Sequence, residues 1–273
     1  MFLKQIQNLM SSSLMQRSDS ELAVFQNDQR STRDHSLNHV LDVGTPYKIF
    51  EAYISSYSQF IDFIKFGWGS ALIDPEFKLK KQLCDEFDIV PMLGGTFFEY
   101  MIHHHSFNHF IDTVSSFGLK CVELSRGTID IEDALYASYI KSLVTDFFVM
   151  SEVGRKSADP SLALTSSQWL SHCELSANAG ASMVILESRE SGRSGYVSTS
   201  GDVNAVMIDS ITKVVPVDSL LFEAPIKSVQ TFLIKRYGAS VNLGNLALSD
   251  LMSVQSLRFG LRSDTLLDVQ ESL

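Results

Sequence analysis

Short apolar runs recur along the chain from residue 39 onward, each followed by a polar or glycine-rich turn and then by a stretch with helical periodicity. Eight runs follow this pattern: HVLDVG (39–44), FIDFIKFG (60–67), DIVPMLGG (88–95), KCVELSRG (120–127), FFVMSEVG (147–154), SMVILESR (182–189), SLLFEAP (219–225) and ASVNLGN (239–245). Their continuous apolarity, without alternation, is typical of strands covered on both faces, as in parallel sheets. The pattern therefore predicts parallel strands separated by helices.

The segments between the runs carry helix signals. Two of them place apolar residues on one helical stripe: Phe107, Phe110, Ile111 and Val114 in the first, and Trp169, Leu170, Cys173 and Ala177 in the second. Asp74 and Pro75 predict a helix start, with the aspartate as N-cap and the proline as first helical residue. Gly118, Gly180 and Gly238 each follow a predicted helix, where a left-handed residue is favoured.

Strand–helix units repeated over about 230 residues predict a (β/α)₈ TIM barrel, an α/β fold in which the carboxyl ends of the strands carry the active site. A doubly wound open sheet is the alternative, but no GxGxxG follows the first strand. We expect a single barrel domain over residues 38–266. Residues 1–37 form a polar extension expected to pack poorly, and residues 267–273 form a solvated tail.

Charge and cysteine content limit the partners and the compartment. The chain has 273 residues with 22 Lys and Arg against 32 Asp and Glu, a net charge of −10 that argues against binding nucleic acid or anionic membranes. No apolar stretch is long enough to span a bilayer, and no secretory signal precedes the barrel. The odd number of distant cysteines predicts reduced thiols in a cytoplasmic protein.

The predicted strand ends carry many cations for an acidic chain. The residues at these positions are Asp42, Lys65, Gly94, Gly95, Arg126, Arg155, Lys156, Arg189, Lys227, Asn242 and Asn245, and the last helix adds Arg258 and Arg262. Cations gathered on one rim predict an anion site, and paired glycines allow backbone amides to approach a phosphate. Lys65, flanked by aromatic residues inside a strand, is predicted either to point into the barrel or to pair with another group, because a lone buried ammonium is costly.

Glu152, Glu187 and Glu223 each end a predicted strand. Three carboxylates on one rim repel one another unless arginine partners or a divalent ion lie among them. Oxygen ligands next to a phosphorylated substrate favour Mg²⁺, whereas a simple salt bridge to a neighbouring arginine is the alternative for each glutamate. Residues 103–105, HHH, do not predict a metal site, because consecutive helical side chains point about 100° apart. We expect them to form a solvated helix end.

Several blocks, in order along the chain, resemble the phosphosulfolactate synthase family. They are DFIKFGWGSALI (62–73), GGTFFEY (94–100), SEVGRK (151–156), ESRESG (187–192), FEAPIK (222–227), VNLGN (241–245) and LRFGLRSDT (257–265). The resemblance covers Val40 to Thr265 and implies a TIM barrel, a homo-oligomer and a Mg²⁺-dependent lyase-type reaction. In that reaction sulfite adds to phosphoenolpyruvate to give (2R)-phospho-3-sulfolactate, which leads to coenzyme M in archaea and to sulfolactate in some bacteria.

The resemblance also implies roles for individual residues. Lys156 matches the lysine that protonates C2, and its pKa is expected to be lowered by neighbouring cations. Lys65 and Arg189 complete the predicted catalytic set by neutralising phosphate and sulfite. The predicted substrate-binding residues are Gly94, Gly95, Arg126, Arg155, Asn242 and Arg262, and the predicted metal ligands are Glu152, Glu187 and Glu223.

Two positions depart from the family pattern. Val43 stands where many members carry lysine, and Arg126 stands where Asp or Asn is usual. The extra guanidinium either compensates for the missing lysine or signals a different phosphorylated anion as substrate. Two further alternatives are a non-catalytic relative, like the heat-stress-associated proteins of plants, and a Schiff-base aldolase that uses Lys65 or Lys156. The intact KFGWG block and Lys156 favour a synthase.

Overall fold

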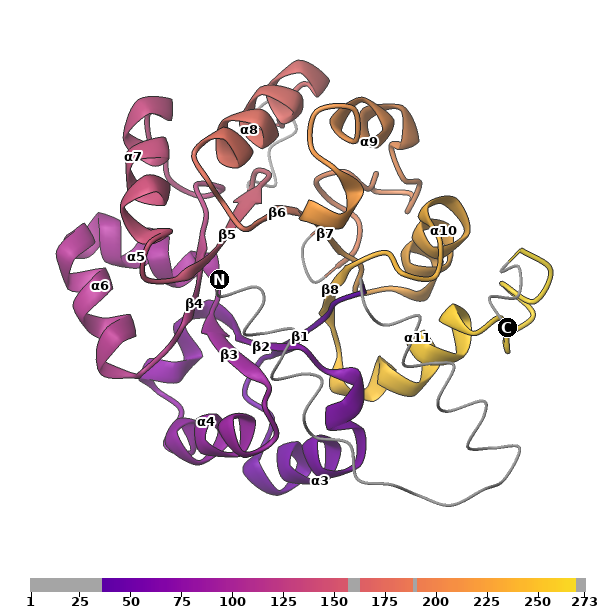
Figure 1. Ribbon diagram of the computed structural model, residues 1–273, viewed down its shortest axis with the longest axis horizontal. Helices are drawn as coiled ribbons and strands as arrows, with labels where there is room; N and C mark the ends of the chain where they lie inside the picture. Colours follow the sequence, from indigo (N-terminus) through magenta and orange to yellow (C-terminus); the bar gives the residue numbers. More distant parts are fainter. Residues whose placement is uncertain (1–35, 157–162, 189–190, 269–273) are drawn as a thin grey trace.

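Eight parallel strands form a nearly closed barrel in the computed structural model, which describes residues 36–156, 163–188 and 191–268 (Figure 1). The strands are β1 (Asn38–Asp42), β2 (Phe63–Phe66), β3 (Val90–Leu93), β4 (Cys121–Leu124), β5 (Phe148–Val153), β6 (Met183–Leu186), β7 (Leu220–Glu223) and β8 (Leu243–Leu246). Their order is β3-β2-β1-β8-β7-β6-β5-β4, and the two ends of this order, β3 and β4, lie side by side. The predicted TIM barrel is confirmed.

Helices surround the strands on the outside (Figure 1). They are α3 (Tyr47–Tyr57), α4 (Phe77–Glu86), α5 (Gly95–His104), α6 (Phe107–Ser116), α7 (Asp133–Leu143), α8 (Ser166–Asn178), α9 (Ala205–Ile211), α10 (Lys227–Tyr237) and α11 (Leu251–Arg258). Both predicted apolar stripes are confirmed as helices: α6 buries Phe110 and Val114, and α8 buries Trp169 and Cys173.

The helix-end predictions have mixed outcomes. Gly118, Gly180 and Gly238 have φ values of 68°, 97° and 93°, so each adopts the positive φ predicted for it. The predicted start of α4 is wrong, because the helix begins at Phe77. Asp74 instead accepts a hydrogen bond from the Glu76 amide, at 2.9 Å, in the turn before the helix.

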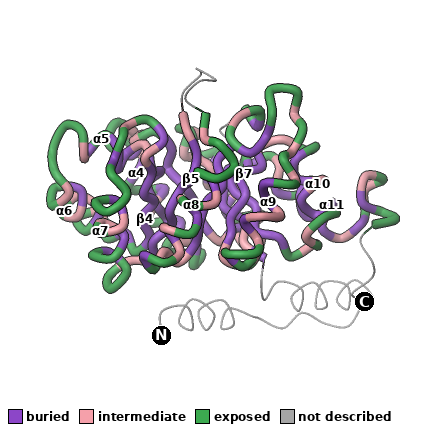
Figure 2. The backbone as a smooth tube through the Cα atoms, turned by 90° about the horizontal axis from the view of Figure 1, so that it is seen from above, coloured by how far each residue is buried: buried purple, intermediate pink, exposed green. Residues whose placement is uncertain are grey.

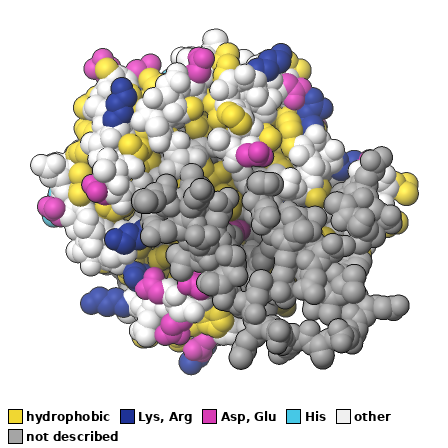
Figure 3. All heavy atoms as spheres, viewed as in Figure 1, with side chains coloured by type: hydrophobic (Ala, Val, Ile, Leu, Met, Phe, Trp, Pro, Cys, Tyr) yellow, Lys and Arg dark blue, Asp and Glu magenta, His cyan; other side chains and the backbone are white. Residues whose placement is uncertain are grey.

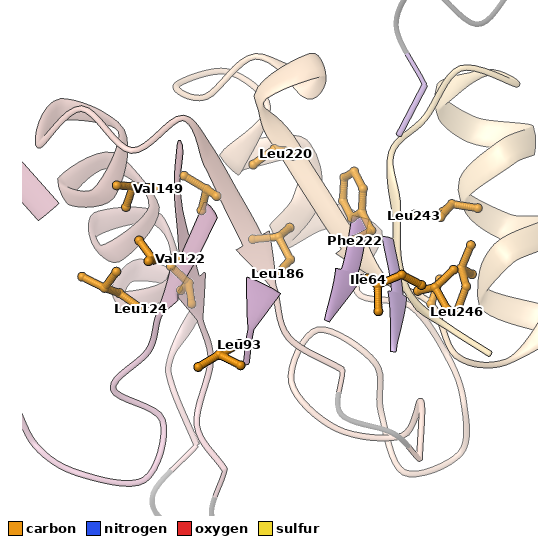
Figure 4. Close-up of a cluster of buried hydrophobic side chains, with 14 of the residues drawn as sticks. Ile64, Leu93, Val122, Leu124, Val149, Leu186, Leu220, Phe222, Leu243 and Leu246 are labelled. Atoms are coloured by element: carbon orange, nitrogen blue, oxygen red, sulfur yellow. The ribbon is translucent and has the colours of Figure 1, made fainter. Parts of the chain in front are cut away.

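Two apolar clusters form the core, one between strands and helices and one inside the barrel. Figure 4 shows part of the first, in which strand residues such as Ile64 and Phe222 face the helices. The second cluster fills the barrel and consists of Phe63, Met92, Cys121, Phe148, Met150, Met183, Ile185 and Leu221. Because successive strand residues point to opposite faces, each strand contributes to both clusters. Figure 2 shows the strands buried and the outer turns exposed.

Residues at the two ends of the described chain and the HHH stretch can be compared with the sequence predictions. Ser36 is buried and the Leu37 amide bonds to Asn242, at 2.8 Å, so these two residues pack on the barrel although they were assigned to the extension. Leu267 is 93% exposed, and residues 1–35 and 269–273 lie outside the described residues. The HHH stretch is exposed at the end of α5, as predicted.

The surface, the cysteines and the helix lengths add three observations. Basic and acidic side chains are interspersed on the described part of the face in Figure 3. All three cysteines are buried and free of disulfides. Within the described ranges, none of the helices combines the length and the apolarity that a membrane crossing requires.

Candidate functional site

Charged side chains lie above the apolar interior at the carboxyl ends of five strands. They are Lys65 of β2, Glu123 of β4, Glu152 of β5, Glu187 just after β6, and Glu223 of β7, each no more than 5% exposed. We call this set the charged layer. All five follow an interior apolar residue by two positions, as Lys65 follows Phe63, so the period of a strand directs them inward.

Lys65 is the cation at the centre of the charged layer. Its Nζ lies 3.1 Å from Glu123 Oε2 and 3.3 Å from Glu223 Oε1, which joins β2 to strands elsewhere on the ring. Burial alone would lower the pKa of the Lys65 ammonium, but the carboxylates of Glu123, Glu223 and Glu152 outweigh burial and raise it. Lys65 therefore points into the barrel, as predicted, and carries its charge there.

Glu123 is a site residue that the sequence interpretation missed. Its Oε1 accepts a hydrogen bond from the Gly95 amide, at 2.6 Å, at the first residue of α5. Burial raises the pKa of Glu123 to about 7, Lys65 opposes this effect, and the nearby Glu152 carboxylate adds to it. A charged residue inside the short apolar strand CVEL was the available signal, the same signal that identified Lys65.

Lys156 lies beside the charged layer, just after β5. Its Nζ is 2.8 Å from Glu152 Oε1 and 3.2 Å from Glu99 Oε1, and it also donates to Ser125 Oγ at 3.0 Å. Burial would lower the pKa of Lys156, but Glu152, Glu99 and Glu187 raise it overall. The predicted lowering was wrong, because carboxylates surround the ammonium where the sequence interpretation placed cations. Raised pKa values also disfavour the Schiff-base alternative, which needs a neutral amine.

The paired glycines make room for protein side chains. A Cβ on Gly94 would lie 3.3 Å from Lys65 Cδ, and a Cβ on Gly95 would lie 2.7 Å from both Cβ and Oγ of Ser125. The Gly95 amide is already bonded to Glu123. These glycines thus allow close packing at the start of α5.

Arg126 and Arg155, two of the three arginines predicted to bind substrate, form ion pairs with aspartates. Arg126 pairs with Asp133, at 2.5 Å, and its guanidinium lies 4.8 Å from the centre of the Tyr136 ring. Arg155 pairs with Asp130, at 2.5 Å. Both line a cavity of about 190 Å³ bordered by α7 and α8. Glu152 of the charged layer lines the same cavity.

Asn242 and Arg262, two further predicted substrate residues, bind groups outside the charged layer. Asn242 precedes β8, where its side chain binds backbone groups of Leu37, Asp218 and Leu220. Arg262 follows α11 and donates to Ser253. Arg189 lies outside the described residues.

The three predicted metal ligands share the charged layer but have different neighbours. Glu152 pairs with Lys156, and Glu223 binds Lys65 and the Ser188 amide, the latter at 3.0 Å. The Glu187 carboxylate lies so close to Gly154 that a Cβ there would be 2.2 Å from Oε2. Across the described ranges, no three acidic, histidine or cysteine side chains are arranged to ligate one ion.

A magnesium site still fits the chemistry of this donor set. The buried carboxylates of Glu99, Glu123, Glu152, Glu187 and Glu223 outnumber the ammonium groups of Lys65 and Lys156. Buried carboxylates in excess favour a cation among them. Mg²⁺ commonly takes only one or two protein carboxylates and completes its shell with water and substrate oxygens.

Comparison with known proteins identifies the family. The family model described as (2R)-phospho-3-sulfolactate synthase (ComA) matches residues 26–264. The chain belongs to this family. It is 38% identical over 246 residues to a phosphosulfolactate synthase of Bacillus subtilis, covering 90% of this chain and 96% of that protein. It is 38% identical over 233 residues to a phosphosulfolactate synthase of Methanocaldococcus jannaschii, covering 84% and 93%.

Solved structures with a similar backbone agree on the fold. A 3-keto-L-gulonate-6-phosphate decarboxylase from Vibrio cholerae has a TM-score of 0.55 at 9% identity, covering 86% of this chain and 99% of the other. A 3-hexulose-6-phosphate synthase has a TM-score of 0.52 at 15% identity, covering 82% and 98%. At these identities the similarity supports the barrel and nothing more specific.

Proposed function

We propose that this chain is a phosphosulfolactate synthase that joins sulfite to phosphoenolpyruvate. The observation that carries the proposal is that two protonated lysines, the buried Lys65 from β2 and the partly buried Lys156 from the end of β5, pair with carboxylates at the same end of the barrel. Membership of the phosphosulfolactate synthase family supports the same reaction.

The reaction needs a proton donor and a stabiliser of negative charge. Sulfite sulfur attacks the methylene carbon of phosphoenolpyruvate, so a C–S bond forms while the C=C π pair moves to C2 and its carboxylate. The Lys156 ammonium then gives a proton to C2, and the resulting amine is reprotonated by solvent or by a second bisulfite. Lys65, held by Glu123 and Glu223, keeps a positive charge near the substrate anions.

Magnesium is part of the proposal. Glu187 and Glu223, at the ends of neighbouring strands, are the residues that would hold the ion, while Glu152 remains with Lys156. When bound, Mg²⁺ supplies Lewis-acid stabilisation of the substrate carboxylate. We further propose that the protein is cytoplasmic and forms a homo-oligomer. Sedimentation of the purified protein measures the oligomeric state.

The test is formation of the product by the purified protein. Phosphoenolpyruvate, sulfite and Mg²⁺ together are expected to give (2R)-phospho-3-sulfolactate, followed by ³¹P NMR. Reactions that lack one component, and a reaction with Lys156→Met, are the controls. Absence of product from the folded wild-type protein with all three components present contradicts the proposal. Product formation at the wild-type rate by Lys156→Met contradicts the role of Lys156.

A further inference from the structure

Glu99 is a buried glutamate of α5 that the proposed reaction does not yet use. Its carboxylate is 2% exposed and accepts hydrogen bonds on both oxygens. Oε1 accepts from Ser125 Oγ at 2.5 Å and from Lys156 Nζ at 3.2 Å. Oε2 accepts from the backbone amides of Thr128, at 2.6 Å, and Ile129, at 2.8 Å. One side chain thus contacts both the lysine and the loop that follows β4.

That loop is shaped around the Lys156 side chain. The Lys156 amide donates to Gly127 O at 2.9 Å. A Cβ on Gly127 would lie 2.9 Å from Lys156 Cγ and 3.2 Å from Cδ, so the aliphatic part of the lysine runs directly against the bare glycine. By binding the two amides after Gly127, Glu99 fixes the surface on which the lysine lies.

The ammonium itself lies between two carboxylates. Glu152 Oε1 lies 2.8 Å from Nζ and Glu99 Oε1 lies 3.2 Å from it, while Ser125 and Thr96 hydroxyls accept at 3.0 and 3.3 Å. An ammonium has three N–H bonds. Glu99 opposes the attraction of Glu152 for the ammonium. Without Glu99, we expect the ammonium to turn toward Glu152 on β5.

We propose that Glu99 is a positioning residue that fixes the direction of the Lys156 ammonium, so that C2 is protonated from one face only. The inference rests on the proposed synthase reaction, in which Lys156 is the proton donor. Its chemical consequence is stereochemical: a displaced donor lets water protonate C2 from either face. A residue needed only for folding would not affect the configuration of the product.

The test is Glu99→Gln, assayed for kcat, KM and product configuration. The glutamine amide can accept from only one of the two donor pairs, because its NH₂ must face the other. We expect kcat to fall about 100-fold, since small misplacements of a reacting group have effects of this size. KM for phosphoenolpyruvate should stay within about twofold, because in this proposal Glu99 acts on the reaction only through Lys156. The product should contain the 2S isomer in addition to 2R.

The matched control is Glu132→Gln, an exposed glutamate before α7, which should leave kcat and configuration unchanged. If Glu99→Gln does not fold, Ser125→Ala removes the hydroxyl shared by Glu99 and Lys156 and is assayed by the same criteria. Wild-type kcat, or a reduced kcat with purely 2R product, overturns the proposal. An inactive wild-type protein contradicts the synthase function itself, so the two failures are distinguishable.

Discussion

Lys65 of β2 and Glu123 of β4 form an ion pair across the interior of the barrel, with 3.1 Å between Nζ and Oε2. The two strands are not neighbours, because β3 lies between them in the sheet. Glu223 of β7 approaches the same ammonium from another side, at 3.3 Å. One buried lysine therefore compensates buried carboxylates from separate strands.

Replacement of Lys65 by methionine should destabilise the protein. The change leaves Glu123 and Glu223 buried without their cation, and breaking such a buried pair typically costs about 3–5 kcal/mol. Urea unfolding of the Mg²⁺-free protein measures the change in free energy of unfolding. Lys235→Met is the control, because Lys235 pairs with Asp268 at the surface and its loss should cost under about 1 kcal/mol. Equal losses for the two variants would contradict the buried pair.

Lys156→Met should abolish most of the turnover. Loss of a general acid reduces kcat by about 10²–10⁴-fold, and KM for phosphoenolpyruvate should change far less. Steady-state kinetics by product formation provide both constants. Lys141→Met, at an exposed position of α7, is expected to match the wild type. A KM effect alone would show that Lys156 binds substrate without donating the proton.

The barrel itself could be predicted because both faces of its strands are covered. Each strand must then be apolar on the helix side and on the inner side, which produces the continuous runs that the sequence displays. Inside those runs a single charged residue is conspicuous. This is why Lys65 was identified, and the same reasoning, applied to Glu123, would have found the second member of the pair.

The sequence interpretation went wrong where it depended on the exact bounds of a strand or on the partners of a charged side chain. Asn242 was placed at a strand end because the apolar run spans 239–245, but the strand is Leu243–Leu246, so Asn242 lies at its amino end. Arg126 follows β4 and pairs with Asp133, seven residues on, a partner that the sequence interpretation did not consider. The pKa of Lys156 was misjudged because carboxylates surround its ammonium: Glu152, four residues earlier, and Glu99, from the distant helix α5.

Gly95→Ala should destabilise the protein more than Gly94→Ala. The new methyl at position 95 would lie 2.7 Å from Ser125 and 3.0 Å from Glu123 Oε1, in a fully packed region. Such overpacking costs about 1–3 kcal/mol. At position 94 the nearest atom is Lys65 Cδ, at 3.3 Å, which belongs to a flexible side chain. Urea unfolding of both variants compares the two, and a Gly95→Ala protein as stable as the wild type would contradict this packing.

Mg²⁺ should stabilise the substrate-free protein through the charged layer. A ligand that binds only the folded state adds about 2.7 kcal/mol at a hundred times its Kd. Thermal unfolding with increasing Mg²⁺ should therefore show a rising Tm, and chelation with EDTA should reverse it. Glu187→Gln is expected to weaken the response, whereas Glu174→Gln, exposed on α8, should retain it. A Tm independent of Mg²⁺ would show that the ion does not bind without substrate.

The ion pairs of Lys80 on α4 should make the free energy of unfolding depend on pH. Its side chain is 1% exposed, and its Nζ lies 3.0 Å from Asp42 Oδ2 and 2.6 Å from Asp74 Oδ2. Burial would lower the pKa of Lys80, but Asp74 and Asp42 raise it overall. Burial would raise the pKa of Asp74, but hydrogen bonds from Lys80 and the Glu76 amide lower it below its ordinary value of 3.8.

The sign of each shift sets the pH range in which the pairing stabilises the fold. A lowered carboxyl pKa contributes stability above the ordinary value, and this contribution is lost as the pH falls through the folded-state value. A raised lysine pKa contributes stability below its ordinary value of 10.5, which is lost at still higher pH. The difference in free energy of unfolding between the wild type and Lys80→Met should therefore be largest between about pH 5 and pH 10 and should shrink below about pH 4.

Urea unfolding of both proteins across this pH range measures the difference. Lys81→Met, which removes the exposed pair with Asp85, should stay within about 0.5 kcal/mol of the wild type at every pH. A difference for Lys80→Met that does not vary with pH would mean that the substitution acts through packing, because only the charge pairing responds to protons.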